Sequence, residues 1–295
     1  MAKPQIQSEP KPPFPAKTLE KPGLEADLRP KPKYEAPNYK PANKLEGKKA
    51  LITGGDSGIG RAVAVMYARE GADVAFTALP AEKPDSDQTK KVIEKLGRRC
   101  VVIEGDLTSE QFCRDAVERT VYELGQLDIL VSNAAHQNRK ESIEEIDEAE
   151  FDRTFKTNVY AFFRLVKAAL PHLEAGASII VTGSETGFEG PDLLPDYSGS
   201  KGAIHTMTKV FAKQLADRGI RVNCVAPGPV WTPLNPADEG ATREKIATFG
   251  KKTPLKRPAQ PEEIAPAYVF LASDADSSYI TGEILAIMGG GTAPG

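Results

Sequence analysis

Beyond Gly47 the sequence alternates short runs rich in apolar and β-branched residues with longer amphipathic runs. We expect strands from the short runs at 49–53, 73–77, 99–104, 127–132, 177–182, 220–226 and 283–288. The longer runs, near 58–70, 86–96, 110–124, 148–172, 198–217 and 261–272, have the length and spacing of helices. Strands that alternate with helices are parallel, and the helices between them cover both faces of the sheet. The sequence therefore predicts an α/β fold: a doubly wound, seven-stranded parallel sheet in a single domain.

Before this alternation the chain has a different composition. Residues 1–44 are rich in proline and lysine, and the prolines interrupt both helical and strand periods. We therefore divide the chain into an extended N-terminal arm, 1–44, and a domain, 45–295, in which we expect 231–253 to form a substrate loop. The arm is either a disordered tail or a segment docked on the domain or on a neighbouring subunit. Its spaced apolar side chains favour docking: Phe14, Leu19, Leu24, Tyr34 and Tyr39.

Charge and hydropathy exclude several classes of function. The net charge is -3, so the overall balance favours neither nucleic acid nor an anionic membrane as a partner. No apolar run reaches the roughly 18 residues that span a bilayer, and the N-terminus lacks the apolar core of a signal peptide, so we expect a cytoplasmic protein. Cys100, Cys113 and Cys224 follow no metal-ligand or CxxC spacing. We interpret them as reduced, buried thiols and expect no metal site.

The first predicted strand leads into a glycine-rich turn, Thr53 to Gly60, with the sequence TGGDSGIG. Glycines let such a turn bend tightly and approach a pyrophosphate, whose charge is received by the free amides of the following helix. Because the turn follows the first strand of a βαβ pattern, it indicates a dinucleotide site rather than an ordinary loop. The turn residues assigned to this site are Gly54, Asp56, Ser57, Gly58, Ile59 and Gly60.

The ends of the second and third predicted strands bear on how a dinucleotide would be bound. The second strand runs into Phe76-Thr77-Ala78-Leu79-Pro80, which offers neither an acid for a ribose 2′-hydroxyl nor an arginine for a 2′-phosphate. Because a phosphate anchor is missing there, the sequence favours NAD over NADP. Asp106, followed by Leu107, ends the third strand. Asp106 either accepts a hydrogen bond from the adenine amino group or caps the helix beginning near Glu110, and we favour the adenine role.

Tyr197 and Lys201 are four residues apart at the start of a predicted helix. One helical turn places the ammonium beside the phenol. A nearby positive charge stabilises a phenolate and lowers the phenol pKa, whose ordinary value of about 10 makes it a poor proton donor or acceptor at neutral pH. Most such pairs on exposed helices are surface packing, so a chemical role depends on the rest of the chain.

Seven motifs in order make a family resemblance recognisable. They are the TGxxxGIG turn, Asp106, Ser132-Asn133-Ala134-Ala135, Asn158, Ser184, Tyr197-x-x-x-Lys201 and Pro227-Gly228-Pro229-Val230-Trp231-Thr232. Over residues 48–290 the chain resembles the short-chain dehydrogenase/reductase family, single-domain branch. Within that family it is similar to long-armed bacterial oxidoreductases of the glucose dehydrogenase-like or aldehyde reductase-like kind, which implies a Rossmann-like fold. It departs from the family pattern at Ala135, where glycine is usual.

The resemblance implies an oxidoreductase that transfers hydride between NAD or NADP and an alcohol or carbonyl substrate. Tyr197 would exchange a proton with the reacting oxygen, while Lys201 lowers the pKa of the phenol and holds the nicotinamide ribose. Ser184 would hydrogen-bond the reacting oxygen, and Asn158 would hold a water that links Lys201 to solvent. The resemblance also implies cofactor contacts from Asn133, Ala134, Pro227, Gly228, Val230 and Thr232.

The substrate and the assembly are less constrained. We expect loops 185–195 and 231–253 to build the substrate pocket, since loops at the carboxyl edge of such a sheet carry specificity. Sugars, polyols, aldehydes, ketones and steroid-like carbonyls all remain open. The expected apolar lining is Phe188, Leu193, Leu194 and Trp231, and the expected polar groups are Glu185, Glu189, Asp192 and Gln137. Helices 148–172 and 198–217 are apolar on more than one face, and the resemblance implies a homotetramer assembled through them.

Two other functions compete with this interpretation. A non-catalytic dinucleotide sensor or scaffold would be expected to lack Tyr197, Lys201 or Ser184, yet all three are present. A hydrolase is suggested by Ser198-Gly199-Ser200-Lys201, which matches the SxxK pattern of serine acylating enzymes. Its companion motifs SDN and KTG are missing, and it would leave the glycine-rich turn unexplained.

Overall fold

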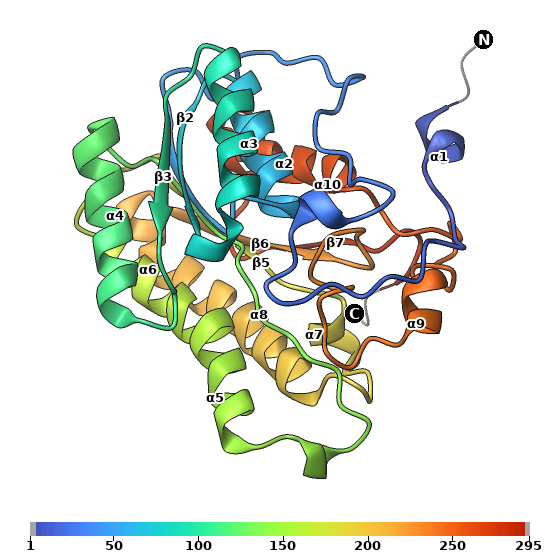
Figure 1. Ribbon diagram of the computed structural model, residues 1–295. Coiled ribbons are helices and arrows are strands. Elements are labelled where there is room, and N and C mark those ends of the chain that lie inside the picture. Colours follow the sequence, from blue (N-terminus) through green and yellow to red (C-terminus); the bar gives the residue numbers. More distant parts are fainter. Residues whose placement is uncertain (1–3, 293–295) are drawn as a thin grey trace.

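Seven parallel strands form one sheet in the order β3-β2-β1-β4-β5-β6-β7 (Figure 1). The computed structural model describes residues 4–292, so the first residues of the predicted arm, 1–3, and the last of the predicted domain, 293–295, lie outside the described residues. The prediction of a doubly wound, seven-stranded parallel sheet is confirmed. The strands are β1 (Lys49–Thr53), β2 (Asp73–Ala78), β3 (Cys100–Glu104), β4 (Ile129–Ser132), β5 (Ser178–Thr182), β6 (Arg221–Pro227) and β7 (Ile284–Ile287).

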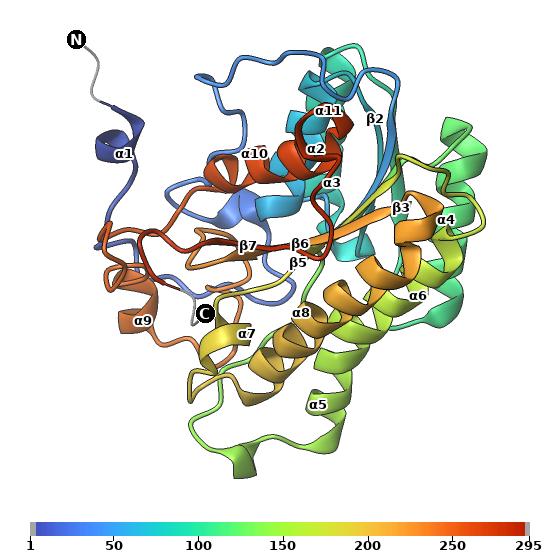
Figure 2. The same cartoon turned by 180° about the vertical axis from the view of Figure 1, so that it is seen from behind.

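Helices cover both faces of the sheet (Figures 1 and 2). The strand order reverses between β1 and β4, which opens a crevice at the carboxyl edge of the sheet at that point. One face packs against α2 (Gly58–Arg69), α3 (Lys83–Lys95) and α10 (Pro261–Ala272), and the other against α4 (Glu110–Leu124), α6 (Ala161–Ala169) and α8 (Pro195–Leu215). The remaining α-helices are α1 (Gln5–Ser8), α5 (Glu148–Phe155), α7 (Thr186–Glu189), α9 (Arg243–Ala247) and α11 (Asp274–Ser277).

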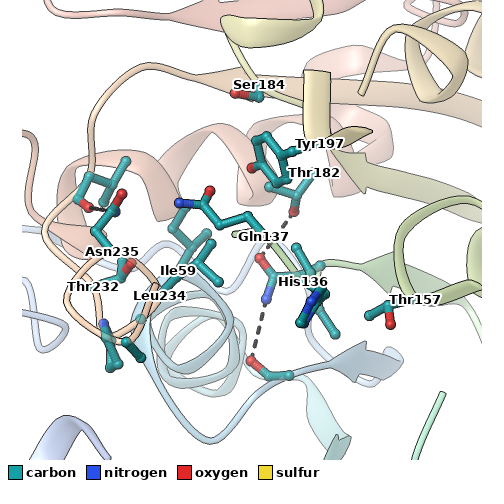
Figure 3. A pocket seen from close by; sticks show the side chains of 18 of the residues that line it. Ile59, His136, Gln137, Thr157, Thr182, Ser184, Tyr197, Thr232, Leu234 and Asn235 are labelled. Carbon is teal, nitrogen blue, oxygen red and sulfur yellow. Dashed lines mark hydrogen bonds between the residues drawn. The ribbon is translucent and has the colours of Figure 1, made fainter. Parts of the chain in front are cut away.

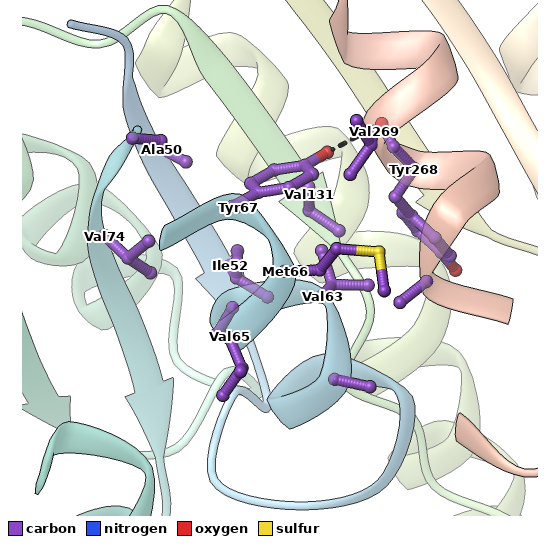
Figure 4. Packing of buried hydrophobic residues seen from close by; sticks show 14 of the residues in the cluster. Ala50, Ile52, Val63, Val65, Met66, Tyr67, Val74, Val131, Tyr268 and Val269 are labelled. Atoms are coloured by element: carbon purple, nitrogen blue, oxygen red, sulfur yellow. Dashed lines mark hydrogen bonds between the residues drawn. The ribbon is translucent and has the colours of Figure 1, made fainter. Parts of the chain in front are cut away.

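The packing between α2, α10 and the sheet fixes the position of the glycine-rich turn (Figure 4). Met66 and Tyr67 of α2 lie over Ile52 of β1, and all three side chains are at most 1% exposed. The Tyr67 hydroxyl donates to the Tyr268 carbonyl of α10 at 3.1 Å, so its polar end is satisfied inside the core. Because α2 is held this firmly, its N-terminus stays at the carboxyl edge of β1.

The predicted helix 148–172 is interrupted in the structure. After α5 the chain forms a π-helical segment, η4 (Lys156–Tyr160), and α6 then begins at Ala161. Apolar residues continue through the interruption, so hydrophobic periodicity could not reveal it. Single π-turns inside α-helices are frequent at functional sites. Among the helices of residues 4–292, none is both long and apolar enough to cross a bilayer.

The arm, from residue 4 to residue 44, lies along the surface of the domain (Figure 1, dark blue). The Phe14 amide donates to the Ala247 carbonyl at 2.9 Å. The Phe14 ring stacks on Trp231 with ring centroids 4.2 Å apart. The Trp231 indole in turn donates to the carbonyl of Pro30 at 2.8 Å. The arm therefore packs directly on the segment predicted to form the substrate loop.

Candidate active site

A cavity of about 600 Å³ lies at the carboxyl edge of the sheet, where the strand order reverses (Figure 3). Its walls come from the glycine-rich turn, the ends of the strands on either side, the start of α8 and the loop after β6. Of the predicted site residues only Gly60 and Asn158 do not line it. Those that do are Gly54, Asp56, Ser57, Gly58, Ile59, Asp106, Leu107, Asn133, Ala134, Ser184, Tyr197, Lys201, Pro227, Gly228, Val230 and Thr232.

Three glycines give the turn its shape. Gly54 and Gly58 have φ of +65° and +53°, a left-handed conformation that side chains rarely adopt. A Cβ on Gly60 would lie 1.9 Å from the Gly54 carbonyl oxygen. Gly60 thus faces the turn rather than the cavity and lets α2 approach β1 closely. The first amide of α2, that of Gly58, donates to the carboxylate of Glu25 in the arm at 2.6 Å.

Asn133 ties together the ends of three neighbouring strands. Its backbone amide donates to the Thr53 hydroxyl at 2.9 Å, and its side-chain amide donates to the Thr53 carbonyl at 3.1 Å. The Thr182 hydroxyl donates to the Asn133 side-chain oxygen at 3.1 Å. Asn133 therefore holds the floor of the cavity as well as lining it. The predicted site residues do not include Thr53 or Thr182, although both are threonines at the carboxyl end of a strand, where such a role can be expected.

Tyr197, Lys201 and Ser184 meet at one side of the cavity. Pro195 begins α8, and one helical turn places the Lys201 ammonium 5.3 Å from the Tyr197 ring centroid. The ammonium donates to the Thr182 carbonyl at 2.8 Å, which fixes its position at the end of β5. Figure 3 shows Tyr197 and Ser184 on this side of the cavity, with Asn235 on another. The predicted proximity of phenol and ammonium is present.

Burial dominates the protonation of both groups. It raises the pKa of Tyr197 to about 12, against the opposing effect of the hydrogen bond with Ser184. It also lowers the pKa of Lys201 to about 8. The lowered phenol pKa expected from the sequence is therefore not found in the chain by itself, because desolvation of the phenolate outweighs its stabilisation by neighbouring charge. With a pKa of about 12, Tyr197 is protonated at neutral pH and available as a proton donor.

Asn158 lies in the π-helical segment, where it is buried and does not line the cavity. Its side-chain oxygen accepts from the His136 amide at 2.8 Å, and its side-chain nitrogen donates to the His136 carbonyl at 3.0 Å. The same nitrogen donates to the Ser200 hydroxyl of α8 at 3.0 Å. Asn158 therefore joins the segment after β4, which lines the cavity, to the helix that carries Tyr197.

The structure excludes one of the two roles expected for Asp106. The N-cap of α4 is Ser109, whose hydroxyl accepts from the Phe112 amide at 3.2 Å, so Asp106 as the helix cap is wrong. Asp106 instead accepts from the Thr108 amide at 2.8 Å and lines the cavity beyond β3. It remains a candidate for binding the adenine end of a dinucleotide.

Three predicted lining residues, Phe188, Trp231 and Glu189, do not line this cavity. Phe188 packs against His205 with ring centroids 4.4 Å apart, and it does not line the cavity. Trp231 is 1% exposed because Phe14 of the arm covers it, and like Glu189 it lines a second cavity of about 690 Å³ instead. Contacts between residues so far apart along the chain cannot be predicted from the local sequence. The other expected residues do line the cavity at the point where the strand order reverses: Leu193, Leu194, Glu185, Asp192 and Gln137.

Sequence reasoning also missed lining residues contributed by distant segments. Lys21 of the arm lines the cavity, and its ammonium donates to the Gln137 carbonyl at 3.1 Å and to the Asn138 side-chain oxygen. Arg139 lines it as well and pairs with Asp238 at 2.5 Å. Glu82, which follows β2 in the 3-10 helix η2 (Pro80–Glu82), lines the opposite end. None of these residues belongs to a motif that the sequence presents locally.

Comparisons with known proteins agree with this geometry. A family model described as enoyl-(acyl carrier protein) reductase matches residues 54–292. General stress protein 39 of Bacillus subtilis is 52% identical over 278 residues, which cover 94% of this chain and 96% of that protein. Glucose and ribitol dehydrogenase homolog 2 of Arabidopsis thaliana is 48% identical over 281 residues, covering 94% and 96%. The likeness to both relatives therefore extends into the arm.

Solved structures give the same result. A short chain dehydrogenase from Burkholderia cenocepacia in complex with NADP has a TM-score of 0.78 and 34% identity, covering 84% of this chain and 98% of that one. An NADH-dependent reductase responsible for alginate metabolism has a TM-score of 0.75 and 32% identity, covering 86% and 100%. The cofactors of these neighbours differ, so they do not favour NAD. By sequence and by structure, the chain belongs to the short-chain dehydrogenase/reductase family of NAD(P)-dependent oxidoreductases, enzymes that act on CH–OH and C=O groups.

Proposed function

We propose that this enzyme transfers hydride between a nicotinamide cofactor and an alcohol or carbonyl substrate, with Tyr197 as general acid and base. The observation that carries the proposal is the convergence of Tyr197, Lys201 and Ser184 in one cavity, across from the glycine-rich turn. The bound nicotinamide would supply or accept the hydride, and the residues of this chain would move the accompanying proton.

The turn fits a dinucleotide. Gly54 and Gly58 have left-handed φ, and Gly60 has no room for a Cβ, so the backbone can approach a pyrophosphate closely. We propose Gly54, Asp56, Ser57, Gly58, Ile59 and Gly60 for the phosphates and the nearer ribose. For the adenine we propose Asp106 and Leu107. For the nicotinamide half we propose Asn133, Ala134, Tyr197, Lys201, Pro227, Gly228, Val230 and Thr232.

The proton chemistry follows from the side chains. In the reductive direction, the protonated Tyr197 hydroxyl donates to the substrate oxygen as negative charge develops there, and Ser184 hydrogen-bonds the same oxygen. The Lys201 ammonium then stabilises the phenolate that forms. We propose that Asn158 holds the surrounding backbone in register and a water that links Lys201 to solvent, which its bonds to His136 and Ser200 support.

We propose a small sugar, polyol, aldehyde or ketone as substrate. The cavity wall combines acids with apolar groups near Tyr197, and both kinds of group suit a hydroxylated carbon chain. A relative 48% identical to this chain is described as a glucose and ribitol dehydrogenase homolog, which supports the same class. The wall residues on which this rests are Glu185, Asp192, Leu193, Leu194 and Leu234.

We also propose NAD as the preferred form of the cofactor. Four cations line the cavity, and three of them are held at its substrate end: Lys21 by Gln137, Arg139 by Asp238 and Lys201 by Thr182. The fourth, Arg153 of α5, lies close enough to Lys21 and His136 for its charge to lower the pKa of both. None of the cavity-lining residues beyond β2 is a cation, among the residues that the structure describes.

The organisation of the molecule is part of the proposal. We propose an arm at 1–44 and a catalytic domain at 45–295 with its substrate loop at 231–253. We propose a homotetramer, which the exposed aromatic side chains of α5, η4 and α6 support: Phe151, Tyr160 and Phe163, between 47% and 48% exposed. We propose a cytoplasmic location, in keeping with three buried free thiols.

Replacing Tyr197 with Phe tests the central claim. We expect turnover to fall by a factor of at least about 100, since the proton donor is lost. NADH or NADPH binding, followed by cofactor fluorescence, should stay within a few-fold of the parent. A panel of sugars, polyols, aldehydes and ketones, assayed at 340 nm with each cofactor, supplies the substrate. Undiminished turnover by Tyr197→Phe would refute the mechanism, and a failure of both nucleotides to bind would refute the reaction class.

A further inference from the structure

The end of the cavity beyond β2 is acidic. Asp56 of the glycine-rich turn and Glu82 of η2 both line it, together with Thr77, Ala78 and Leu79. In a doubly wound sheet the dinucleotide spans the point where the strand order reverses, and its adenosine ribose lies beside the glycine turn and the end of the second strand. The two carboxyl groups therefore flank the place where that ribose would lie.

Asp56 has unused hydrogen-bonding capacity. The residue is only 2% exposed, yet the carboxylate oxygen Oδ2 has no hydrogen-bond partner among the described residues. A buried acceptor without a donor is unfavourable, so such an atom indicates a donor that arrives with a ligand. Glu82 accepts from the Leu79 amide at 2.8 Å through Oε2, which orients its carboxyl group at the end of β2.

Charge at this end is unfavourable for a phosphate. Burial and the neighbouring carboxylate of Asp56 raise the pKa of Glu82 to about 8, and burial raises the pKa of Asp56 to about 6. The two groups are therefore close enough to repel one another when both are ionised. A ribose diol offers two hydroxyl donors to this pair, whereas a 2′-phosphate would add nearly two further negative charges.

Arg61 favours the ionised form of Asp56, but this cation is itself bound to other groups. Arg61 is 3% exposed, and its guanidinium donates to Glu25 at 2.6 Å and to the Asp85 carbonyl at 2.9 Å, with the Asp85 carboxylate 3.2 Å away. Its Nε donates to the backbone carbonyl of Asp56 at 2.6 Å. The Arg61 guanidinium is therefore bonded to the arm and to α3, and Arg61 does not line the cavity. Lys83, the next residue after Glu82, pairs with Asp87 at the surface at 2.8 Å.

We propose that Asp56 and Glu82 together bind the 2′- and 3′-hydroxyls of the adenosine ribose and thereby select NAD(H) over NADP(H). The position that usually carries a ribose-binding acid, at the end of the second strand, is Ala78 here. The selecting groups come instead from the turn before it and from the short helix after it. This inference rests on the proposed function, since it assigns the cofactor of the same site.

The test is direct binding of NADH, NADPH, ADP-ribose and 2′-phospho-ADP-ribose, measured by calorimetry on the full chain at about pH 9, above the pKa of both Glu82 and Asp56. We expect the ligands without the 2′-phosphate to bind roughly 10- to 100-fold more tightly, the range that follows from losing a hydrogen bond to a charged group. Asp56→Asn and Glu82→Gln should each reduce this ratio by roughly 10-fold. Asp192→Asn, which removes a carboxylate from the substrate end of the same cavity, should leave it unchanged.

The outcomes separate this inference from the proposed function. If none of the four ligands binds, the proposed function fails. If NADPH binds as tightly as NADH, or if the ratio is the same in Glu82→Gln as in the parent, the inference fails while the function stands. Circular dichroism on each variant shows whether it is folded, which matters most for Asp56→Asn because Asp56 is the more deeply buried of the two residues. Glu82 is only half-buried, so its variant keeps the test decisive if Asp56→Asn does not fold.

Discussion

Gly60 has no role in lining the cavity, yet it decides whether the glycine-rich turn can form. A Cβ there would come within 1.9 Å of the Gly54 carbonyl and 2.7 Å of the Asn133 side chain. The groups that would have to move are backbone and a side chain that ties β1, β4 and β5 together. The glycine is therefore required by packing, and the site depends on it indirectly.

We predict that Gly60→Ala destabilises the protein by about 3 kcal/mol or more, because a rigid backbone group must be displaced. The matched control is Gly199→Ala in α8, where a new Cβ would meet Phe155 of the described chain at 3.8 Å, an ordinary van der Waals distance. Gly199 is helical, so alanine there should stabilise by up to about 1 kcal/mol. Urea unfolding of both variants measures the difference, and equal effects would contradict the packing argument.

At the scale of single elements, burial explains which predictions succeed. Strands β1 and β2 are covered on both faces, so their sequences are nearly continuous apolar runs that can be recognised without any partner. The π-helical segment at 156–160 leaves the apolar pattern unbroken and therefore escaped prediction. The sequence places Trp231 in the substrate pocket, and this prediction is wrong because Phe14, which covers the indole, lies more than 200 residues away along the chain.

Some residues of the candidate site can be predicted from the sequence, and others cannot. Turn glycines and the Tyr197/Lys201 pair are visible in the sequence because their spacing along the chain is what places them. Glu82 and Lys21 reach the cavity only through the course of η2 and of the arm, which no local pattern records. The pKa of Tyr197 also needed the structure, since burial depends on the whole surrounding fold.

The arm contributes one buried carboxylate to the glycine-rich turn. Glu25, in the 3-10 helix η1 (Glu25–Asp27), accepts from the Gly58 amide at 2.6 Å and pairs with Arg61 at 2.6 Å. The carboxylate of Asp85 on α3 accepts the Glu25 backbone amide at 2.6 Å. The arm is thereby fastened to the two elements that form the adenosine end of the cavity, and it supports the start of α2 from outside.

We predict that Glu25→Ala destabilises the protein by about 2 to 3 kcal/mol, less than the usual effect of breaking a buried ion pair because Asp85 still faces Arg61. The dinucleotide Kd should rise as well, since the Gly58 amide loses the partner that orients the turn. Thermal melting and cofactor titration measure the two effects. Glu20→Ala, an exposed acid of the same arm, is the control, and similar losses in both variants would refute a specific anchor.

At the scale of the whole molecule, the proposed tetramer predicts the effect of a surface charge. Phe163 of α6 is 48% exposed, and with Phe151 and Tyr160 it places three aromatic side chains on one stretch of chain. Phe163→Glu should shift the assembly to dimers or monomers, because a carboxylate would be buried at the interface. Tyr122→Glu on α4 is the control at an 86% exposed site. Light scattering after gel filtration measures the mass of the assembly. An unchanged mass for Phe163→Glu would show that this surface is not the subunit interface.

The acids around the cavity also make the stability of the cofactor-free protein depend on pH. Burial raises the pKa of Glu25 and of Glu185 to about 7 and that of Glu82 to about 8, from an ordinary value of 4.5. Between pH 4.5 and these values the folded state binds more protons than the unfolded state, so stability falls as pH rises. Buried His205, with its pKa lowered to about 4, acts in the opposite sense only below about pH 6.5.

We therefore predict that the melting temperature of the cofactor-free protein decreases from pH 6.5 to pH 7.5. Above pH 6.5 His205 no longer affects the pH dependence of stability. Near pH 8 the folded protein begins to lose the Lys201 proton, and from there this group makes stability rise with pH. Glu82→Gln should flatten the decrease, because the group that binds the extra proton is gone. Glu118→Gln, an exposed acid on α4, should leave it unchanged. A melting temperature that rises across this window would mean that these carboxyl groups are ionised in the folded state at their ordinary pKa.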